Sequence, residues 1–334
     1  RISTAFFNSQ QNVIKKLLAE FDGRIDPNEQ YSPFEMNGKM YQSRMISGME
    51  YGQVIELSEE GGKVFFDENT RAKGFKYYEL AGFSISPDNK ILAIAEDYVG
   101  RRQYKISFID IATGEQLQEE IKNTSGFFAW AQDSKTIYYS TVEKQSLRSN
   151  KVFKHVIHSP NEKDMLIFEE KNKLFNAIII SPNWKKSLFI VSVSSSTTKY
   201  YEMASDGSAT TPVLFMKTEK GHEYKVLPHD NGYYILSNYN AENRQILFSK
   251  KRPESIADCQ VLIPHDSSIH IENVSILKNT LIIQQRKKGL DEVKLLDLNT
   301  LQISYVPFKE ETFYVKIFEL DKFESNYFYF SYNS

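Results

Sequence analysis

The stretch SISPDNKILAIAEDYVGRRQYKISFIDIATGEQL, residues 84–117, reads as one complete antiparallel sheet unit. It predicts a strand ending at Ser86, a tight turn over 87–89, and strands over 91–96 and 104–111. Proline pre-sets φ for a turn, and Asp and Asn tolerate turn conformations. The alternation of apolar and polar residues between the turns indicates strands. Thr113-Gly114 then turns the chain toward an outer strand.

A similar unit recurs with a period of about 45–50 residues, which is typical of repeat architectures. Its clearest marker is a two-residue turn between the first two strands of each unit. This turn occurs at Asn37-Gly38, Asp88-Asn89, Asp133-Ser134, Asn183-Trp184, Asn231-Gly232, Asn279-Thr280 and Ser325-Asn326. The segments after these turns are rich in β-formers: MYQSRM, ILAIAE, TIYYST, LFIVSV, YYILSN, LIIQQR and YFYFSY. Four strands per unit and seven units predict an all-β fold, a seven-bladed β-propeller over residues 31–334.

The seventh unit is incomplete in the sequence. Residues 312–320 and 327–332 supply two strands, and the chain stops at Ser334 where a second hairpin should begin. An unpaired edge strand is a liability that natural sheet proteins avoid. We therefore expect the chain to end within the seventh blade and to be part of a longer protein.

Residues 1–30 are predicted to form a helical segment before the propeller. A helix is expected over 8–25, with Asn8 or Ser9 as its cap and Gly23 at its end. Its apolar residues share one face at helical spacing, namely Val13, Ile14, Leu17, Leu18 and Phe21. This face needs a partner surface, either the flank of the propeller or a second domain.

Composition excludes several classes of function. The formal net charge of the 334 residues is -2, which gives no electrostatic reason to expect nucleic acid or an anionic membrane as a partner. No apolar run approaches the ~20 residues that span a bilayer. The single cysteine, Cys259, excludes an internal disulfide and fits a reducing compartment. We expect a cytoplasmic location, with the periplasm as the alternative, and a small buried apolar role for Cys259.

The familiar catalytic motifs are missing from the sequence. The nearest match to a serine nucleophile elbow, Gly82–Ser86, lacks the second glycine and lies on a predicted strand. His155 and His158 are expected to face different ways, so a zinc site is not predicted. The carboxylate pairs Glu96-Asp97 and Glu169-Glu170 stand at strand ends, where a surface role is favoured over acid–base catalysis. We expect no catalytic residue, metal site or cofactor in this chain.

One polar cluster stands out. Arg101 and Arg102 end a loop that Glu96 and Asp97 open. The four residues could form local surface salt bridges, which are individually weak. The two arginines could equally bind a carboxylate on a partner domain or a substrate, because the planar guanidinium fits a carboxylate.

Several stretches resemble the oligopeptidase B (protease II) branch of the prolyl oligopeptidase family of serine peptidases. They are AEDYVGRRQYKISFIDIATGE, ELAGFSISPDNKILA, WAQDSKTIYYST, VFKHVIHSP with the following LIFEEKN, and QRKKGLDEV. The resemblance implies a two-domain enzyme that cleaves short peptides after Arg or Lys. A seven-bladed propeller would cover the active-site entrance of an α/β-hydrolase domain that carries Ser, Asp and His.

The resemblance also gives expectations for single residues. Glu96, Asp97, Arg101 and Arg102 would lie near the interdomain face, and the N-terminal helix would pack on the catalytic domain. Lys76 departs from the pattern, because relatives often have an acidic residue there. The expected partners are the C-terminal α/β-hydrolase domain of the same polypeptide and short peptide substrates. This chain would be the non-catalytic gate and size filter, inactive by itself.

Two other functions remain open at the level of sequence. A stand-alone propeller that binds a protein partner should have complete blades, and the Gly-His and Trp-Asp signatures of one such class are not found. A propeller enzyme acting at its own axis needs carboxylates or histidines on several inner strands. The predicted inner strands ELAGFSIS, FFAWA, NAIIIS and NVSIL are mostly apolar or small.

Overall fold

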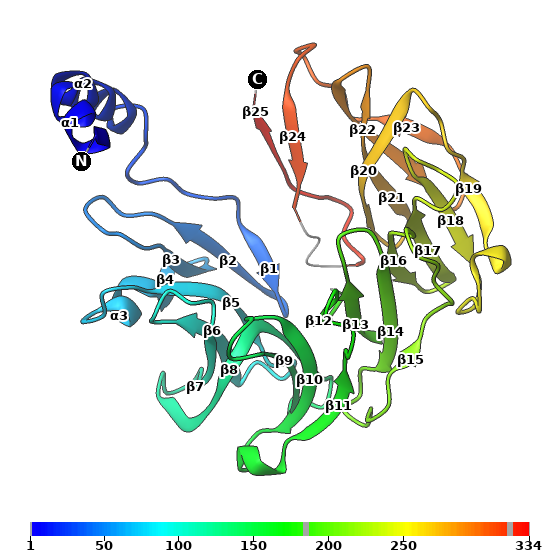
Figure 1. The fold of residues 1–334 in the computed structure, drawn as a ribbon, viewed down its shortest axis with the longest axis horizontal. Helices are drawn as coiled ribbons and strands as arrows, with labels where there is room; N and C mark the ends of the chain where they lie inside the picture. Colours follow the sequence, from blue (N-terminus) through cyan, green and yellow to red (C-terminus); the bar gives the residue numbers. More distant parts are fainter. Residues whose placement is uncertain (1, 183–186, 319–322, 334) are drawn as a thin grey trace. The chain divides into compact units, whose positions relative to one another are not determined.

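The computed structural model describes residues 2–182, 187–318 and 323–333. The chain divides into two compact units, residues 1–74 and 75–334. The described residues form mainly β-strands, as the sequence predicts, and their three α-helices all belong to the first unit (Figure 1). The predicted domain boundary at residue 30 stays a prediction.

The N-terminal segment contains two helices, α1 (Ile2–Ser9) and α2 (Gln11–Asp22). The helix predicted over 8–25 corresponds to α2, but α1 was not predicted, and the prediction of Asn8 or Ser9 as the cap is wrong because α2 begins after Gln10. The Ser9 hydroxyl donates back to the Phe6 carbonyl at 2.7 Å, so Ser9 closes α1 and does not cap α2. Gly23 follows the end of α2 as predicted, and its N–H donates to the Ala19 carbonyl.

The apolar side chains of α2 are largely exposed. Leu17 is 46% exposed and Phe21 is 56% exposed, although both are large apolar side chains. Helices with such a stripe normally bury it against another element. The requirement for a partner surface therefore stands.

The first sheet also belongs to the first unit and has the strand order β1-β2-β3-β4. Its strands are β1 (Phe34–Met36), β2 (Lys39–Arg44), β3 (Gln53–Ser58) and β4 (Gly61–Asp67). Met36 pairs with Lys39 across the predicted Asn37-Gly38 turn, in which both residues have positive φ (46° and 85°). Asn-Gly is the preferred pair for this hairpin turn. The short helix α3 (Glu68–Ala72), which the sequence analysis missed, begins after Asp67, whose side chain accepts from the Asn69 N–H.

The second unit begins with a seven-stranded sheet in which every strand pairs with the next along the chain. Its strands are β5 (Glu79–Ile85), β6 (Ile91–Asp97), β7 (Tyr104–Asp110), β8 (Gln116–Trp130), β9 (Thr136–Val142), β10 (Ser149–Val156) and β11 (Met165–Glu169). Two turns have the backbone that the sequence predicts, because Asn89 and Ser134 adopt positive φ of 62° and 59°.

Three four-stranded sheets and a hairpin follow. The first has β12 (Asn176–Ile180), β13 (Ser187–Val193), β14 (Thr198–Ala204) and β15 (Val213–Leu214). The second has β16 (Tyr224–His229), β17 (Gly232–Ser237), β18 (Gln245–Ser249) and β19 (Gln260–Ile263). The third has β20 (Ile269–Ile276), β21 (Thr280–Lys287), β22 (Leu290–Asp297) and β23 (Ile303–Tyr305). The hairpin pairs β24 (Tyr314–Ile317) with β25 (Phe330–Asn333).

Two sequence predictions concern residues that lie wholly or partly outside the described ranges. The Asn183-Trp184 turn lies outside the described residues, as does Leu320 at the end of the strand predicted over 312–320. The described strands of the last unit are shorter than predicted, since β24 begins at Tyr314 and β25 at Phe330.

Strand β8 joins what the sequence predicts as two separate blades. It pairs with β7 as far as Thr124 and with β9 from Thr124 to Trp130. The junction needs a glycine: Gly126 has φ of 86°, and a Cβ at this position would lie 2.7 Å from the Ala81 Cβ. One strand therefore serves as the outer strand of one blade and the inner strand of the next.

Within the second unit, successive sheets pack face to face through apolar clusters. Trp130 and Ile137 lie in the first cluster, and Leu188 and Ile190 of β13 pack on β9 and β10 in the second. Tyr200 and Ile235 lie in a further cluster between β14 and β17. Burial of such a side chain contributes about 1.5–3 kcal/mol. The sheets follow one another as in a propeller, and the predicted count of seven blades stays a prediction.

Candidate functional site

The predicted cluster after β6 is built around the carboxylate of Asp97, which is buried. Its Oδ1 accepts the backbone N–H groups of Val99 and Gly100 at 2.8 and 3.1 Å. Its Oδ2 accepts those of Arg101 and Arg102 at 2.8 and 2.7 Å. A charged acceptor makes hydrogen bonds roughly twice as strong as a neutral one. Asp97 therefore fixes the shape of the whole loop.

The neighbouring Glu96 is also buried and accepts a hydrogen bond from the Tyr78 hydroxyl at 3.1 Å. The surface role that the sequence favours for the carboxylate pairs is therefore wrong for Glu96 and Asp97. It is wrong for Glu170 as well, which is buried and accepts from the Ser192 hydroxyl at 2.6 Å. Each buried carboxylate has hydrogen-bond donors, as buried polar groups normally do: the loop N–H groups for Asp97 and a side-chain hydroxyl for Glu96 and for Glu170.

Aromatic side chains cover this loop. The ring of Tyr98 lies 4.3 Å from that of Phe75 and 5.5 Å from that of Tyr78, measured between centroids. The Lys105 ammonium lies 5.4 Å above the Tyr98 ring. Phe75 stays 55% exposed despite these contacts. Gly100 has φ of 77° and lies against Tyr77, so a larger residue there would be both strained and crowded.

Two tyrosines beside the loop are held in their neutral form. Tyr77 donates to Glu79 at 2.7 Å, and this hydrogen bond is the main cause that raises the pKa of Tyr77 to about 12. Burial, followed by the charge of Glu79, raises the pKa of Tyr104 to about 12. Both phenols are therefore hydrogen-bond donors at neutral pH rather than bases.

The three predicted cations of this region, Lys76, Arg101 and Arg102, have exposed side chains. What Asp97 binds is the backbone of the two arginines, so the structure shows a carboxylate-capped loop where the sequence suggested a set of salt bridges. The loop thus presents basic side chains and an aromatic rim, while its carboxylates are turned inward. A role for these residues in binding a domain or a substrate stays a prediction.

A second polar cluster, which the sequence analysis missed, surrounds His155 of β10. The imidazole is fully buried, its Nδ1 lies 2.6 Å from Asp164 Oδ1, and its Nε2 lies 3.5 Å from Glu119 Oε2. Tyr139 donates to the other Asp164 oxygen at 2.8 Å, and burial, followed by this hydrogen bond, raises the pKa of Tyr139. His158 is exposed, but its Nδ1 lies 3.7 Å from the other oxygen of Glu119, so both imidazoles approach one carboxylate and the prediction that they face different ways is wrong.

No local pattern could have revealed this cluster, because Glu119 lies far upstream on β8 and meets His155 only through the sheet. It is a buried polar network that ties β8 and the turn before β11 to β10. No group of three or more His, Cys, Asp or Glu residues within the described ranges is arranged to hold a metal ion.

One other sequence prediction is confirmed, and a second, the buried position of Cys259, is confirmed only in part. Gly82–Ser86 continues β5 into a turn, where the Ser86 hydroxyl donates to Asp88 Oδ1 at 2.7 Å, so it is not a nucleophile elbow. Cys259 packs, half-buried, against an apolar cluster. Burial is the main cause that raises the pKa of its thiol to about 11, so the thiolate is scarce at neutral pH.

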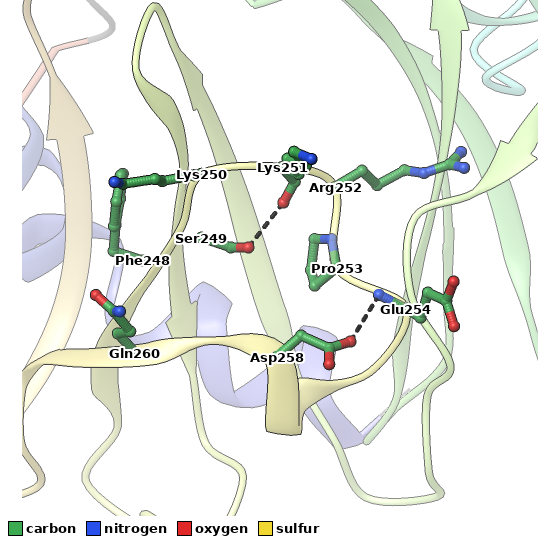
Figure 2. A pocket seen from close by; sticks show the side chains of 9 residues that line it. All are labelled: Phe248, Ser249, Lys250, Lys251, Arg252, Pro253, Glu254, Asp258 and Gln260. Atoms are coloured by element: carbon green, nitrogen blue, oxygen red, sulfur yellow. Dashed lines mark hydrogen bonds between the residues drawn. The ribbon is translucent and has the colours of Figure 1, made fainter.

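A pocket of about 450 Å³ lies beside the hairpin after β18. Its lining contains three consecutive basic residues, Lys250, Lys251 and Arg252, which suggests an anion site. Figure 2 shows, however, that the side chains of Lys250 and Arg252 point in opposite directions. The hairpin is fixed instead by its own bonds, from Ser249 Oγ to the Lys251 carbonyl and from the Glu254 N–H to Asp258. This pocket does not converge on one charged group.

Comparison with known proteins fixes the family. The model of the N-terminal beta-propeller domain of prolyl oligopeptidase matches residues 1–334. The chain belongs to the prolyl oligopeptidase family. This match confirms the resemblance inferred from the sequence motifs. A separate observation is that none of the helices among the described residues is long and apolar enough to cross a membrane.

Two relatives are named as an aminopeptidase and a protease. Dipeptidyl aminopeptidase BI of Pseudoxanthomonas mexicana is 24% identical over 300 residues, covering 84% of this chain and 41% of that protein. Protease 2 of Moraxella lacunata is 24% identical over 327 residues, covering 95% of this chain and 46% of that protein. The chain thus spans less than half the length of these two relatives.

Solved structures show the same fold. Oligopeptidase B from Leishmania major superposes with a TM-score of 0.90 at 22% identity, covering 98% of this chain and 48% of that one. Oligopeptidase B from Trypanosoma brucei, in a closed form with covalently bound antipain, gives a TM-score of 0.86 at 20% identity. That match covers 97% of this chain and 48% of that one.

Proposed function

We propose that this chain is the gating propeller of an oligopeptidase B-like serine peptidase that cleaves short peptides after Arg or Lys. The observation that carries the proposal is the match of residues 1–334 to the propeller domain of a peptidase family. This match does not favour the alternative of a stand-alone propeller scaffold. The chemistry of cleavage would belong to an α/β-hydrolase domain of the same polypeptide.

Two surfaces described above support a partner domain. The apolar face of α2 is exposed, and contact of such a face with water is unfavourable in free energy unless another surface covers it. The loop after β6 presents Arg101 and Arg102 outward on a backbone that Asp97 holds rigid. A rigid loop loses little conformational freedom on binding, so it suits repeated opening and closing against a partner.

The propeller's role in this proposal is steric and kinetic. A folded protein cannot enter a site covered by packed sheets, whereas a short flexible peptide can reach it when the domains part. We place the enzyme in the cytoplasm, where a single cysteine without a disulfide partner is usual.

The experiment measures hydrolysis of fluorogenic peptides by the intact protein. Substrates ending in Arg or Lys should be cleaved, and otherwise identical peptides ending in Ala should not. The same Arg-containing sequence should be cut as a short peptide and spared within a folded protein. Equal cleavage of the Arg and Ala peptides would overturn the specificity, and release of dipeptides from free N-termini would point to the activity that the Pseudoxanthomonas relative is named for.

The 334-residue chain alone should hydrolyse none of these peptides, and measurable cleavage by it would contradict the assignment of catalysis to another domain. The role of the loop is tested with Arg101→Ala/Arg102→Ala in the intact protein. We expect kcat/KM for the Arg peptide to fall about tenfold, equivalent to about 1.4 kcal/mol. The control Lys250→Ala/Lys251→Ala removes two adjacent exposed cations from another loop and should leave kcat/KM unchanged.

A further inference from the structure

A second pocket, of about 330 Å³, lies between the sheet β16–β19 and the sheet β20–β23. Its lining is mostly aliphatic, with Leu262 and Ile263 of β19 on one side and Ile269, Ile271 and Ile303 on the other. This volume is at the lower end of the range for small-molecule sites, which are typically apolar with a few placed polar groups. The polar groups present here are unusual.

The first of them is Lys294 of β22, which is only 8% exposed. Among the described residues no hydrogen bond or ion pair to its ammonium is found, and the ammonium lies 5.9 Å from the centroid of the Tyr305 ring. Burial lowers the pKa of Lys294, as expected for an ammonium removed from water without an acceptor. Lysines are almost never buried unless they are paired.

The second is Gln285 of β21, which is 1% exposed. Its amide nitrogen donates to Glu292 at 2.8 Å, and this bond fixes the side chain. Its Oε1 is buried and has no hydrogen-bond partner among the described residues. A buried acceptor without a donor costs about 1–3 kcal/mol. The pocket lining therefore contains one buried acceptor without a hydrogen-bond partner and one ammonium for which the described residues supply no acceptor.

The sheet register brings the two groups together. Gln285 pairs with Glu292, and Lys294 stands two residues further along the same strand, so both side chains project from one face of the sheet. Such diagonal neighbours are roughly 7–8 Å apart, within reach of long side chains. A single small group between them can accept from the ammonium and donate to the amide oxygen.

The remaining charges on the lining leave a positive balance. Arg244 lines the pocket and is held by the carbonyls of Ile271 and Glu272 at 3.2 and 2.7 Å. Asp266 is the opposing carboxylate, and its Oδ1 is occupied by the Ser268 N–H and hydroxyl, each at 2.7 Å. His265, also on the lining, is exposed beside it. Lys287 and Glu292, near Lys294, offset each other in charge.

We propose that this pocket binds a small monocarboxylate with an aliphatic side chain and an N–H next to the carboxylate, as in an N-acylated aliphatic amino acid. The carboxylate accepts from Lys294, the N–H donates to Gln285 Oε1, and the side chain lies against Leu262 and Ile263. Gln285 Oε1 then has a donor, and the Lys294 ammonium has an anionic partner. The proposal does not depend on the peptidase activity, because the pocket lies wholly between two sheets of this chain.

The test is calorimetric titration of the intact protein with N-acetyl-L-leucine. We expect a Kd of about 1 mM or tighter, which corresponds to about -4 kcal/mol. N-acetyl-L-leucine amide lacks the carboxylate and 4-methylpentanoate lacks the N–H, and both should bind at least tenfold more weakly. Absence of binding at 10 mM, or equal binding of the amide, would overturn the proposal.

Lys294→Met keeps the length of the side chain and removes its charge, and it should weaken binding of N-acetyl-L-leucine at least tenfold. Lys250→Met removes a lysine from the other pocket and should leave the affinity unchanged. Equal affinities of the two variants would refute the site. If Lys294→Met fails to fold, Ile303→Trp fills the pocket from a half-exposed position and should abolish binding; retained binding in that variant would refute the site equally.

Discussion

Replacing Asp97 by Asn tests whether one carboxylate holds the loop after β6. An asparagine side chain keeps one acceptor oxygen and places an amide NH2 where the second oxygen was. If the remaining oxygen keeps the Val99 and Gly100 donors, the N–H groups of Arg101 and Arg102 lose their acceptor and face a donor instead. The variant changes no volume, so packing is not the cause of any loss.

The magnitude follows from these two bonds. Hydrogen bonds to a charged group contribute about 1.5–3 kcal/mol each, which gives about 3–6 kcal/mol for two. Arg101 and Arg102 are exposed, so water can take up part of the loss. We therefore expect the free energy of unfolding to fall by about 3 kcal/mol, a large fraction of the 5–15 kcal/mol typical of a domain.

The assay is urea unfolding of the intact protein, followed by tryptophan fluorescence and circular dichroism. Asp110→Asn is the matched control, because Thr113 donates its N–H and its hydroxyl to the same oxygen of Asp110, which asparagine retains. It should cost less than about 1 kcal/mol. Hydrogen exchange at Arg101 and Arg102 should accelerate only in Asp97→Asn. A loss below about 0.5 kcal/mol in that variant would refute the reasoning, since surface changes without such bonds stay in that range.

Three further predictions concern buried polar groups. His155→Leu leaves Asp164 and Glu119 without their buried partner and should lower the free energy of unfolding by about 3–5 kcal/mol, with a smaller loss when Asp164→Asn is added, measured as a double-mutant cycle in urea. Burial lowers the pKa of His222 to about 4, below the unfolded value near 6.5. The fold is therefore fully stable above pH 6.5, where His222 is neutral in both states, and the free energy of unfolding falls by about 2–3 kcal/mol as the pH falls to 4. His222→Gln should remove that slope from urea unfolding between pH 6.5 and 4, and an unchanged slope would contradict the assignment. Lys294→Met should raise the free energy of unfolding at pH 7 by about 1 kcal/mol. Because burial lowers the pKa of Lys294, this gain should shrink as the pH approaches 10.5. A loss of stability in this variant at pH 7 would mean that the ammonium has favourable partners in the fold.

Local chemistry made much of the fold predictable. Asn37-Gly38 and Asp88-Asn89 mark turns because their backbone conformations favour these residues, and the strands between the turns follow from alternation with period two. The motif around residues 95–115 was specific enough to indicate the family, which the match over residues 1–334 confirms.

What failed depends on contacts between distant residues or on competition between similar local options. Ser9 could have capped a helix or closed one, and only its bond to the Phe6 carbonyl decides. Glu96 and Asp97 look like surface charges until the loop folds its own N–H groups onto Asp97. His155, Asp164 and Glu119 come together across three segments of one sheet. Lys294 and Gln285 were likewise invisible as a pair before the register of β21 and β22 was known.

The long strand β8 has a consequence for how this protein can be cut and rearranged. Loops between repeats are the usual entry points for proteases, insertions and transplanted segments. Where a linker would normally stand, β8 has only the buried Thr124, which pairs with both neighbours, and the three residues 125–127, with the crowded Gly126 among them. The two repeats that meet in β8 should therefore unfold together and be exchanged between proteins only as one unit, whereas the loops between the other repeats can accept cleavage and insertions.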